Sequence, residues 1–333
     1  MSLPARVARP TMKDVAAEAA VSLKTVSRAL GNEPGVRTAT RERVVAAANR
    51  LGFRRNDLAA SLRRLDRSMA TVGLVIEDLG NPFYASVMRG VEAEMRARGH
   101  VLLVASSEED STLEREIVDT FLSRRVDGLI VVPASRDQSY LARDRAAGVA
   151  VVYLDRPPEP LVADCVLADN ATGATEAVGH LLELGHRRIG YVGDADTLFT
   201  MQERYGGYRS ALVAAGIALD EQIVRHGAAD VVRAEAAVAE LLAVASPPTA
   251  IFAGNNRCTV GAVRALHGRR PAFGLVGYDD FELADLLDPP VTVIANDARA
   301  LGRVAAQRLL ARLDGDERSP RRIVLPTKLI VRD

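Results

Sequence analysis

Several things are scarce in this sequence, and each scarcity excludes a class of protein. The 333 residues contain no tryptophan, only 4% aromatic residues and two isolated cysteines, Cys165 and Cys258, which fit neither a disulfide framework nor a zinc site. No apolar run approaches the length of a membrane span, and the N-terminal MSLPARVARP lacks the apolar core of a signal peptide. We therefore expect a soluble, cytoplasmic protein with no membrane partner.

Catalytic signatures are missing as well. The sequence contains no G-x-G-x-x-G, no P-loop, no H-E-x-x-H and no G-x-S-x-G, and its five histidines are scattered. An enzyme would need such a constellation of groups. We predict that the chain is not an enzyme and uses no cofactor, no metal and no catalytic residue.

The overall net charge is zero, but the charges are unevenly distributed along the chain. Residues 1–70 contain 14 Lys and Arg against 6 Asp and Glu, a formal charge of +8, and the remainder carries −8. A basic segment on an acidic body is typical of a nucleic-acid-binding module joined to another domain. On charge alone, a solvated arginine-rich tail is an equally good interpretation.

The pattern of residues 11–52 predicts three short helices. Thr11 with Asp14 resembles a capping box before the first helix, and Ser22 is a good N-cap for a second helix that ends near Leu30. Thr38 or Thr40 can open the third helix, and Gly52 can end it. Its buried face is expected to contain Val44, Val45, Ala48 and Leu51.

The first two predicted helices are separated by Ala20, Val21 and Ser22, which is the tight connection of a helix-turn-helix. The outer side of the second helix carries hydrogen-bond donors and small apolar groups that suit base edges and phosphates in a major groove. They are Leu23, Lys24, Thr25, Ser27 and Arg28. A three-helix bundle with a merely polar outer face is the alternative interpretation.

From Thr71 onward, short apolar strands alternate with amphipathic helices. We expect strands at 71–76, 101–106, 128–132, 151–154, 188–193, 223–224, 250–254 and 274–278. We expect helices at 84–98, 112–125, 171–184, 205–215, 232–244 and 259–267. Continuous apolar strands between helices predict an α/β fold with parallel sheets covered on both faces. Two doubly wound lobes account for this pattern better than the alternative, a closed eight-fold barrel, because late segments return after residue 290.

Three segments carry a resemblance to a known family. MKDVAAEAAVSLKTVSRALGN, VRTATRERVVAAANRLGFRRN and LAASL resemble the DNA-binding part of the lactose/galactose repressor family, and the resemblance extends over nearly the whole chain. It implies a helix-turn-helix domain at 10–54 and a hinge helix at 55–70. It also implies a core like the periplasmic binding proteins, with one lobe at 71–165 plus 297–325 and the other at 166–296 plus 326–333.

The resemblance also implies roles for individual residues of the basic segment. Leu23, Lys24 and Arg28 match positions that set base preference, and Leu62 matches the hinge leucine that wedges into the minor groove. The full predicted DNA-binding set is Thr11, Lys13, Leu23, Lys24, Thr25, Ser27, Arg28, Asn32, Asn56, Ala59 and Leu62. Two positions depart from the family: Ala20 stands at a position, often glycine, that can need a positive φ angle, and Arg55 stands where a proline is usual.

Polar residues follow the predicted strands of the core, where ligands of parallel-sheet proteins bind. The predicted effector-binding residues are Asp78, Asn81, Phe83, Tyr84, Asp155, Arg204, Asn255, Asp279 and Asn296. Carboxylates, amides and arginine suit a hydroxyl-rich ligand, and Phe83 and Tyr84 can supply an aromatic platform. Each Asp or Asn has an alternative role as a helix N-cap or turn residue. We expect Arg204 to open a helix.

These observations favour one function over its rivals. A secreted solute-binding protein would share the core but would need a signal peptide and would have no DNA-binding segment. We predict a ligand-responsive transcriptional repressor that binds a near-palindromic operator in double-stranded DNA as a homodimer. A sugar or related metabolite is its expected effector. The final PTKLIVRD lacks a leucine heptad, which favours a dimer over a tail-bundled tetramer.

Overall fold

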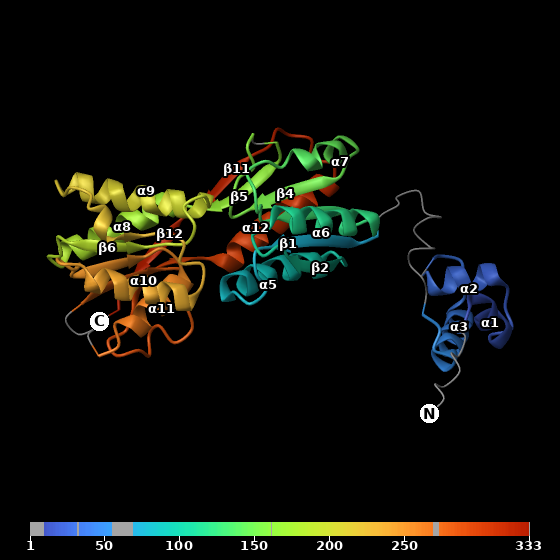
Figure 1. The fold of residues 1–333 in the computed structure, drawn as a ribbon. Helices are drawn as coiled ribbons and strands as arrows, with labels where there is room; N and C mark the ends of the chain where they lie inside the picture. The colour runs from blue at the N-terminus through green and yellow to red at the C-terminus, as the bar shows by residue number, and fades with distance from the viewer. Residues whose placement is uncertain (1–9, 32, 55–68, 161, 269–272, 333) are drawn as a thin grey trace, which may run out of the picture. The chain divides into compact units, whose positions relative to one another are not determined.

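The computed structural model describes residues 10–31, 33–54, 69–160, 162–268 and 273–332. The chain falls into two units, Met1–Met69 and Ala70–Asp333, which we call the head and the core. Short helices form the described part of the head, and helix-covered sheets form the core (Figure 1). Each unit is described separately below.

The head contains the three predicted helices. They are α1 (Met12–Glu18), α2 (Leu23–Leu30) and α3 (Thr38–Leu51). Thr11 donates from its backbone N–H and its hydroxyl to Asp14 Oδ2 (2.7 and 2.8 Å), and Ser22 Oγ accepts the N–H of Thr25 at 3.1 Å. The capping residues expected for the first two helices are therefore confirmed.

The third helix differs in detail from its prediction. Its N-cap is Arg37, so Thr38 is the first helical residue, and Gly52 ends the helix in the left-handed conformation at φ +66°. Val45 was predicted to be buried, but it is 41% exposed. The core of the head is instead formed by Val15, Ala19, Val26, Ala29, Val44, Ala47 and Ala48. Ala47 lies three residues after Val44 and so shares its face, whereas Val45 is turned about 100° away.

The turn between α1 and α2 contains a strained alanine. Ala20 has φ +51°, a conformation that glycine adopts freely and that is unfavourable for a residue with a Cβ. The positive φ expected at this position is therefore confirmed. The turn still closes, because the N–H of Val21 donates to the carbonyl of Ala16 at 3.0 Å.

Two six-stranded sheets form the core. The first has the order β11-β5-β4-β3-β1-β2 and is parallel throughout, and its lobe is called the first lobe. The second, in the second lobe, has the order β12-β10-β9-β8-β6-β7 and is parallel except for β12. The first sheet contains β1 (Thr71–Ile76), β2 (Val101–Ser106), β3 (Gly128–Val131), β4 (Ala150–Leu154), β5 (Asp164–Ala168) and β11 (Arg322–Leu325). The second contains β6 (Ile189–Val192), β7 (Val224–Arg225), β8 (Ala250–Ala253), β9 (Gly274–Tyr278), β10 (Thr292–Asn296) and β12 (Thr327–Ile330).

Helices cover both faces of each sheet (Figure 1). They are α5 (Pro82–Ala97), α6 (Ser111–Ser123), α7 (Ala142–Ala146), α8 (Asn170–Glu183), α9 (Phe199–Ala214), α10 (Val231–Ala243), α11 (Asn256–Ala265) and α12 (Ala298–Leu313), with short 3-10 turns at Ser139–Leu141 and Glu221–Ile223. Two open sheets confirm the predicted fold class, and the eight-fold barrel is wrong. Because α9 begins at Phe199, Arg204 lies inside this helix and does not open it.

The chain passes between the lobes three times, each time through a single residue. Asp169 connects β5 to α8, Asp297 connects β10 to α12, and Pro326 connects β11 to β12. The crossings lie side by side: the N–H of Asp169 donates to the carbonyl of Leu325 at 2.9 Å, and Asn296 is paired with Thr327. The predicted lobe boundary between residues 165 and 166 must move, because it cuts β5, which belongs wholly to the first sheet.

Candidate functional site

The predicted recognition surface lies on α2. Leu23 is 44% exposed, Lys24 is exposed, and Thr25, Ser27 and Arg28 are half-exposed. The two residues of α2 that are buried are Val26 and Ala29, so the polar side of the helix faces away from the head's core. Thr11 and Lys13, at the start of α1, are also exposed. Asn32, Asn56, Ala59 and Leu62 lie outside the described residues.

Several arginines of the head have structural partners. Arg43 Nε donates to the carbonyl of Ala19 at 3.0 Å, and Arg50 pairs with Glu18 at 3.0 Å. Arg28 donates to the carbonyl of Pro34 and lies 3.7 Å from Glu33. Part of the basic excess of the head therefore holds its helices together, and Lys13 and Lys24 are the exposed cations of the predicted contact set.

A cavity of about 30 Å³ lies between the two lobes of the core. Residues that follow the carboxyl ends of β1, β4, β6, β8 and β9 line it, as expected for ligand sites in parallel-sheet proteins. We call it the inner cavity. Its lining consists of Glu77, Asn81, Phe83, Tyr84, Asp155 and Arg156 from the first lobe, and Asp194, Leu198, Thr200, Met201, Arg204, Asn255, Asn256 and Asp279 from the second.

Two aspartates occupy equivalent places in the two lobes. Asp155 follows β4 and Asp279 follows β9, and both have φ +66°. The N–H of Asp155 donates to the carbonyl of Val166 on β5, and that of Asp279 donates to the carbonyl of Ile294 on β10, each at 2.8 Å. The same backbone device thus directs one buried carboxylate from each sheet toward the cavity.

Arg204 positions the second-lobe aspartate. Its guanidinium donates to Asn170 Oδ1 at 2.8 Å, to the carbonyl of Gly254 at 2.7 Å and to Asp279 Oδ2 at 3.3 Å. The guanidinium carbon lies 3.7 Å from the centre of the Tyr278 ring, within the range of a cation–π contact. Asn296 adds a hydrogen bond to Asp279 Oδ1 at 2.8 Å, so both oxygens of this carboxylate have partners.

Arg156 plays the corresponding part in the first lobe, but for different acids. It donates to Glu77 at 3.0 Å and to both oxygens of Glu109 at 2.5 and 2.6 Å. Among the described residues, the hydrogen-bond donor to Asp155 is the Tyr84 hydroxyl at 3.4 Å, which is shared with Glu77 at 3.1 Å, and Asp155 Oδ1 is buried without a partner. The two aspartates therefore share a backbone position but differ in how their charge is met.

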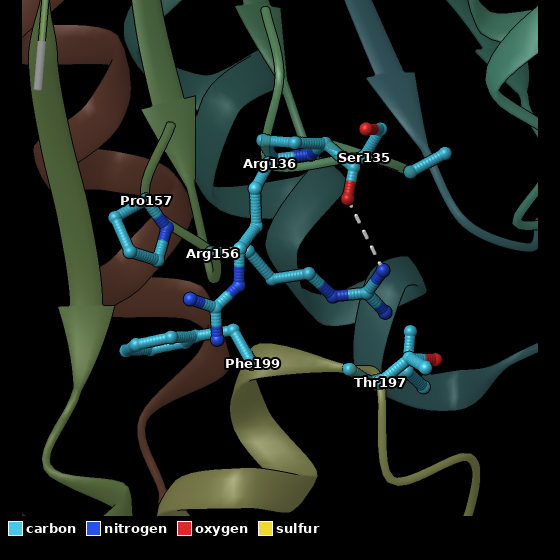
Figure 2. A pocket seen from close by; sticks show the side chains of 9 residues that line it. Ser135, Arg136, Arg156, Pro157, Thr197 and Phe199 are labelled. Atoms are coloured by element: carbon cyan, nitrogen blue, oxygen red, sulfur yellow. Dashed lines mark hydrogen bonds between the residues drawn. The ribbon is translucent and has the colours of Figure 1, made fainter. Parts of the chain in front are cut away.

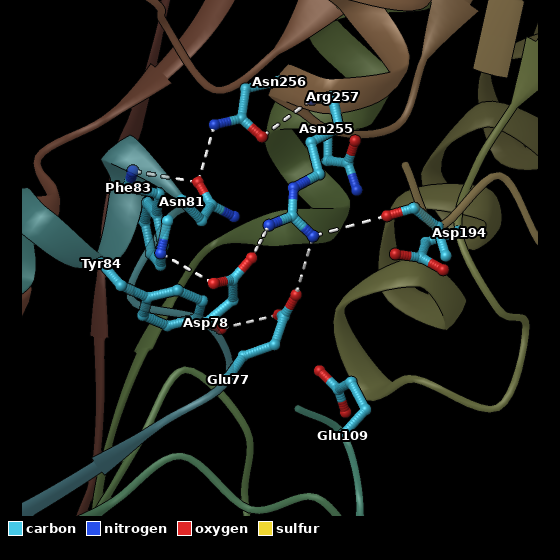
Figure 3. Close-up of polar contacts among 12 residues, drawn as sticks. Glu77, Asp78, Asn81, Phe83, Tyr84, Glu109, Asp194, Asn255, Asn256 and Arg257 are labelled. Carbon is cyan, nitrogen blue, oxygen red and sulfur yellow. Dashed lines mark hydrogen bonds and ion pairs between the residues drawn. The ribbon is translucent and has the colours of Figure 1, made fainter. Parts of the chain in front are cut away.

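Direct contacts close the inner cavity across the lobes. Asn256 Nδ2 donates to Asn81 Oδ1 at 2.9 Å, and Arg257 pairs with Asp78 and lies 3.5 Å from Glu77. Figure 3 shows the Arg257 side chain reaching from α11 between Asp78 and Glu77. These contacts join residues that follow β1 to residues of α11, so anything that parts the lobes must break them.

Burial changes the acid–base behaviour of the cavity. Desolvation raises the pKa of Glu77 to about 7, with Arg156 opposing the shift and Glu109 adding to it. Desolvation also raises the pKa values of Asp155, Asp194 and Asp279. A shift in the same direction at four acids means that the cavity disfavours further negative charge.

A larger cavity of about 310 Å³ adjoins the inner one, and the two share Arg156 and Leu198. We call it the outer cavity. Figure 2 shows Arg136, Pro157 and Phe199 on one side of it and Thr197 on the other. Arg136 forms an exposed ion pair with Glu159 at 3.1 Å and donates to Gln202, so its charge already has a partner within the chain.

The structure brings together most of the predicted effector-binding residues. Of that set, Asn81, Phe83, Tyr84, Asp155, Arg204, Asn255 and Asp279 line the inner cavity. Asp78 and Asn296 do not line it but contact residues around it. Tyr84 is buried and its hydroxyl donates to Glu77 at 3.1 Å, which leaves Phe83 as the more open of the two predicted rings. The N-cap alternative also holds for Asn81 and Asn255.

Sequence reasoning missed the other charged residues of the site. Glu77, Glu109, Arg156, Asp194 and Arg257 meet only because distant segments fold against one another. One local signal existed, since Glu77 and Arg156 directly adjoin the predicted Asp78 and Asp155. Among the residues that the structure describes, no group of three or more His, Cys, Asp or Glu side chains could hold a metal ion.

Comparisons with known proteins fit both units. Residues 11–56 match the family model "Bacterial regulatory proteins, lacI family", and residues 69–333 match "Periplasmic binding proteins and sugar binding domain of LacI family". The HTH-type transcriptional regulator CelR of Thermobifida fusca is 36% identical over 98% of this chain and 98% of its own. The HTH-type transcriptional repressor CytR of Escherichia coli K12 is 30% identical over 97% and 95%.

Solved structures of related proteins share the fold of this chain. A lac repressor dimer bound to operator and the anti-inducer ONPF superposes with a TM-score of 0.84 at 26% identity, covering 98% of both chains. A CelR–cellobiose complex gives 0.70 at 33% identity, covering 97% of this chain and 99% of the other. The fold is therefore that of a ligand-responsive DNA-binding regulator.

The chain belongs to the LacI family of bacterial transcriptional regulators, and the predicted family and general function are confirmed. Its relatives regulate transcription and are not enzymes, so the prediction of a non-enzyme is also confirmed. Within the described parts of the chain, no helix is both long enough and apolar enough to cross a bilayer.

Proposed function

We propose that the chain represses transcription as a homodimer on a near-palindromic operator, and that a hydroxyl-bearing small molecule between the lobes changes its affinity for DNA. The observation that carries this proposal is the inner cavity, whose walls come from both lobes. Asn256 and Arg257 of the second lobe contact Asn81 and Asp78 of the first lobe beside it. A ligand too large for this cavity would alter the spacing of the lobes when it binds there. Its effect on DNA binding equals its differential affinity for the two states, typically about 1–3 kcal/mol.

The size of the cavity supports a role in lobe opening. About 30 Å³ holds roughly two water molecules, so a sugar ring cannot enter without parting the lobes or occupying the outer cavity as well. The outer cavity, at about 310 Å³, lies at the lower end of the roughly 300–1,000 Å³ typical of ligand sites. A ligand whose ring enters the inner cavity would therefore favour a more open core, whereas one that places only a small group there and its body in the outer cavity would not need to part the lobes.

On the head, we propose that α2 enters the major groove. Lys24 and Arg28 would donate to guanines or phosphates, Thr25 and Ser27 would bond phosphates or base edges, and Leu23 would pack against a thymine methyl group. Thr11, Lys13 and Asn32 would hold the backbone, and Asn56, Ala59 and Leu62 would act through the hinge. Two heads related by two-fold symmetry would then read two half-sites.

Fluorescence anisotropy on DNA from the chain's own upstream region tests this function. We expect tight binding that weakens steeply with salt and that one compound from a panel of sugars and nucleosides shifts. Lys24→Ala should lower the salt slope by about 1, whereas Lys328→Ala, an exposed lysine of β12, should leave it unchanged. A salt slope near zero would refute the proposed contacts of the head.

Two further measurements address the dimer and the hinge. Sedimentation equilibrium should give twice the 35.7 kDa mass of the chain, and a monomer at the concentrations that occupy the operator would contradict the dimer.

Leu62→Ala should weaken specific binding far more than non-specific binding, because a wedge acts only where the duplex is kinked. Equal losses in both would count against the wedge.

A further inference from the structure

The inner cavity contains two buried carboxylates, Asp155 and Asp194, that accept no hydrogen bond from a cationic side chain among the described residues. Asp155 is 4% exposed, and its Oδ1 has no hydrogen-bond partner in the part of the chain that the structure describes. The cation nearest to it in the ion pairs of the described residues is Arg156, whose Nε lies 3.8 Å from the other oxygen. Asp194 is 8% exposed and accepts the N–H of Ala195 at 2.7 Å, and it forms no ion pair with a described residue.

The arginines around the cavity are already engaged with other acids. Arg156 binds Glu77, both oxygens of Glu109 and the carbonyl of Pro133. Arg204 binds Asp279, as described above, and Arg257 is shared between Glu77 and Asp78. Only the Nε of Arg156, which lies 3.8 Å from Asp155 Oδ2, is left over for Asp155, and no hydrogen bond from these three arginines to Asp155 or Asp194 is present among the described residues.

A surplus of negative charge follows. The cavity and its ion-paired partners carry six carboxylates (Glu77, Asp78, Glu109, Asp155, Asp194 and Asp279) against three guanidinium groups (Arg156, Arg204 and Arg257). Removing unpaired carboxylates from water is costly, and the raised pKa values of Asp155 and Asp194 report that cost. A neutral hydroxyl could satisfy the free oxygen, but it would leave the charge unbalanced.

The dimensions of the two cavities indicate how a ligand would be arranged. An ammonium group is about the size of a water molecule and therefore fits the inner cavity of about 30 Å³. The body of the ligand would occupy the outer cavity of about 310 Å³, where Arg136 is already matched by Glu159. Charge and size thus indicate a small cationic group on a larger neutral body.

We propose that the effector carries a protonated amine, as an amino sugar does, and that its ammonium group is held by Asp155 of the first lobe and Asp194 of the second. This inference rests on the proposed function, because it assumes that the effector binds between the lobes. The ammonium would donate to Asp155 Oδ1, which has no other donor, and it would bridge the lobes. Amine-bearing ligands would then bind in preference to their neutral counterparts.

Isothermal titration calorimetry on the full chain tests the amine directly. Glucosamine, galactosamine and mannosamine are each compared with the parent sugar and with the N-acetyl derivative, in which the charge is removed. We expect at least one amine to bind about tenfold or more tighter than both of its neutral forms, since charge-assisted hydrogen bonds are among the stronger polar contacts. Amines that bind no tighter than their neutral forms, or do not bind, would overturn the inference.

Variants then test the two aspartates. Asp155→Asn and Asp194→Asn keep the shape but remove the charge, and each should reduce the preference for the amine about tenfold. Asp119→Asn, at an exposed position on α6, is the matched control and should keep the preference. A preference that survives both Asp155→Asn and Asp194→Asn would overturn the assignment. Operator binding by each variant confirms that it folds.

The same panel separates this inference from the proposed function. A neutral sugar or nucleoside that shifts operator binding more strongly than the amines do would overturn the amine and leave the ligand-responsive repressor intact. Mg²⁺ alone raising the Tm, with the rise lost in Asp155→Asn and Asp194→Asn, would replace the amine by an inorganic cation. If no compound shifts operator binding, the proposed function and the inference fail together.

Discussion

Asp155 and Asp279 show how the two lobes use one backbone device for different ends. Both residues directly follow a strand, adopt φ +66° and donate their N–H to the neighbouring strand. Asp279 is then fully bonded by Arg204 and Asn296, whereas Asp155 keeps one buried oxygen without a partner. Backbone geometry sets where each carboxylate lies, and the side chains around it decide whether it is already satisfied.

This difference distinguishes a residue with a supporting role from the one that we propose binds the ligand. Asp279 completes a network that holds Arg204 against Tyr278 and Gly254, so much of its role is internal to the second lobe. Asp155 faces an arginine that two glutamates already occupy. The first lobe is therefore the one whose aspartate keeps an unpartnered oxygen among the described residues.

The largest expected effect comes from removing the arginine of the second lobe. Arg204→Met should lower the free energy of unfolding by about 3–5 kcal/mol, because it leaves Asp279 as a buried charge without its cation and removes donors from Asn170 and Gly254. Urea unfolding followed by circular dichroism measures the change. A loss below about 1 kcal/mol would mean that water replaces the guanidinium, and the second lobe would not be the satisfied one.

Glu77 of the first lobe should give the core a pH dependence. Its pKa is about 7 in the fold against a usual 4.5, so between these values the folded protein binds more protons than the unfolded chain. Stability should therefore fall as the pH rises from about 4.5 to about 7, by up to about 3 kcal/mol. Glu77→Gln, which resembles the protonated form, should match the native protein at pH 4.5 and exceed it at pH 8 in urea unfolding. An equal difference at both pH values would contradict this linkage.

Neutralising Asp155 and Asp279 one at a time should change the free energy of unfolding in opposite directions. Asn tolerates a positive φ well, so neither substitution disturbs the backbone. Asp279→Asn should lower the free energy of unfolding by about 2 kcal/mol, because Arg204 loses a charged acceptor. Asp155→Asn should raise it by about 1 kcal/mol, because the desolvation cost of a buried carboxylate with one unpartnered oxygen disappears. The urea midpoints of the two variants, measured side by side without ligand, test this prediction. Two decreases in stability of similar size would remove the contrast between the lobes.

The smallest expected effect lies at the contact between the lobes. Asn256→Ala removes the hydrogen bond to Asn81 and should cost about 1 kcal/mol or less, while favouring a more open core. Small-angle scattering of the free variant should show a larger radius of gyration than that of the native protein. Asn49→Ala, at an exposed position on α3 of the head, is the control and should leave the core unchanged. No change in either variant would show that Asn256 does not hold the lobes together.

Local signals allowed the sequence to predict most of the fold. The head helices were predictable from local signals, because Thr11 and Ser22 cap the starts of α1 and α2 and Gly52 caps the end of α3. Strands β5, β10, β11 and β12 were missed as strands. β5 begins with Asp164, a charge that suggests a loop, yet Asp164 is buried because Arg308 and Arg312 bind it at 2.9 and 2.8 Å. Those partners lie more than 140 residues away and leave no local trace.

The site was predictable to the same extent. Polar residues after apolar strands located Asp155, Asn255 and Asp279 on one cavity, because the carboxyl ends of parallel strands meet at one edge. Which acid pairs with which arginine was not predictable. The contact of Arg257 with Asp78 joins the two lobes across 179 positions of sequence, and no periodicity reports such a contact. The charge surplus of the cavity became visible only once these pairs were known.

The three single-residue crossings at Asp169, Asp297 and Pro326 have a mechanical consequence. Because the crossings lie side by side and are joined by hydrogen bonds and strand pairing, the lobes share one axis and have little freedom to slide or twist independently. We therefore expect compounds that part the lobes to move the core along a similar path, whatever their chemistry. Effectors of opposite sign would differ in where they stop along that path, and a substitution at a crossing would change the stiffness of the joint for all of them alike.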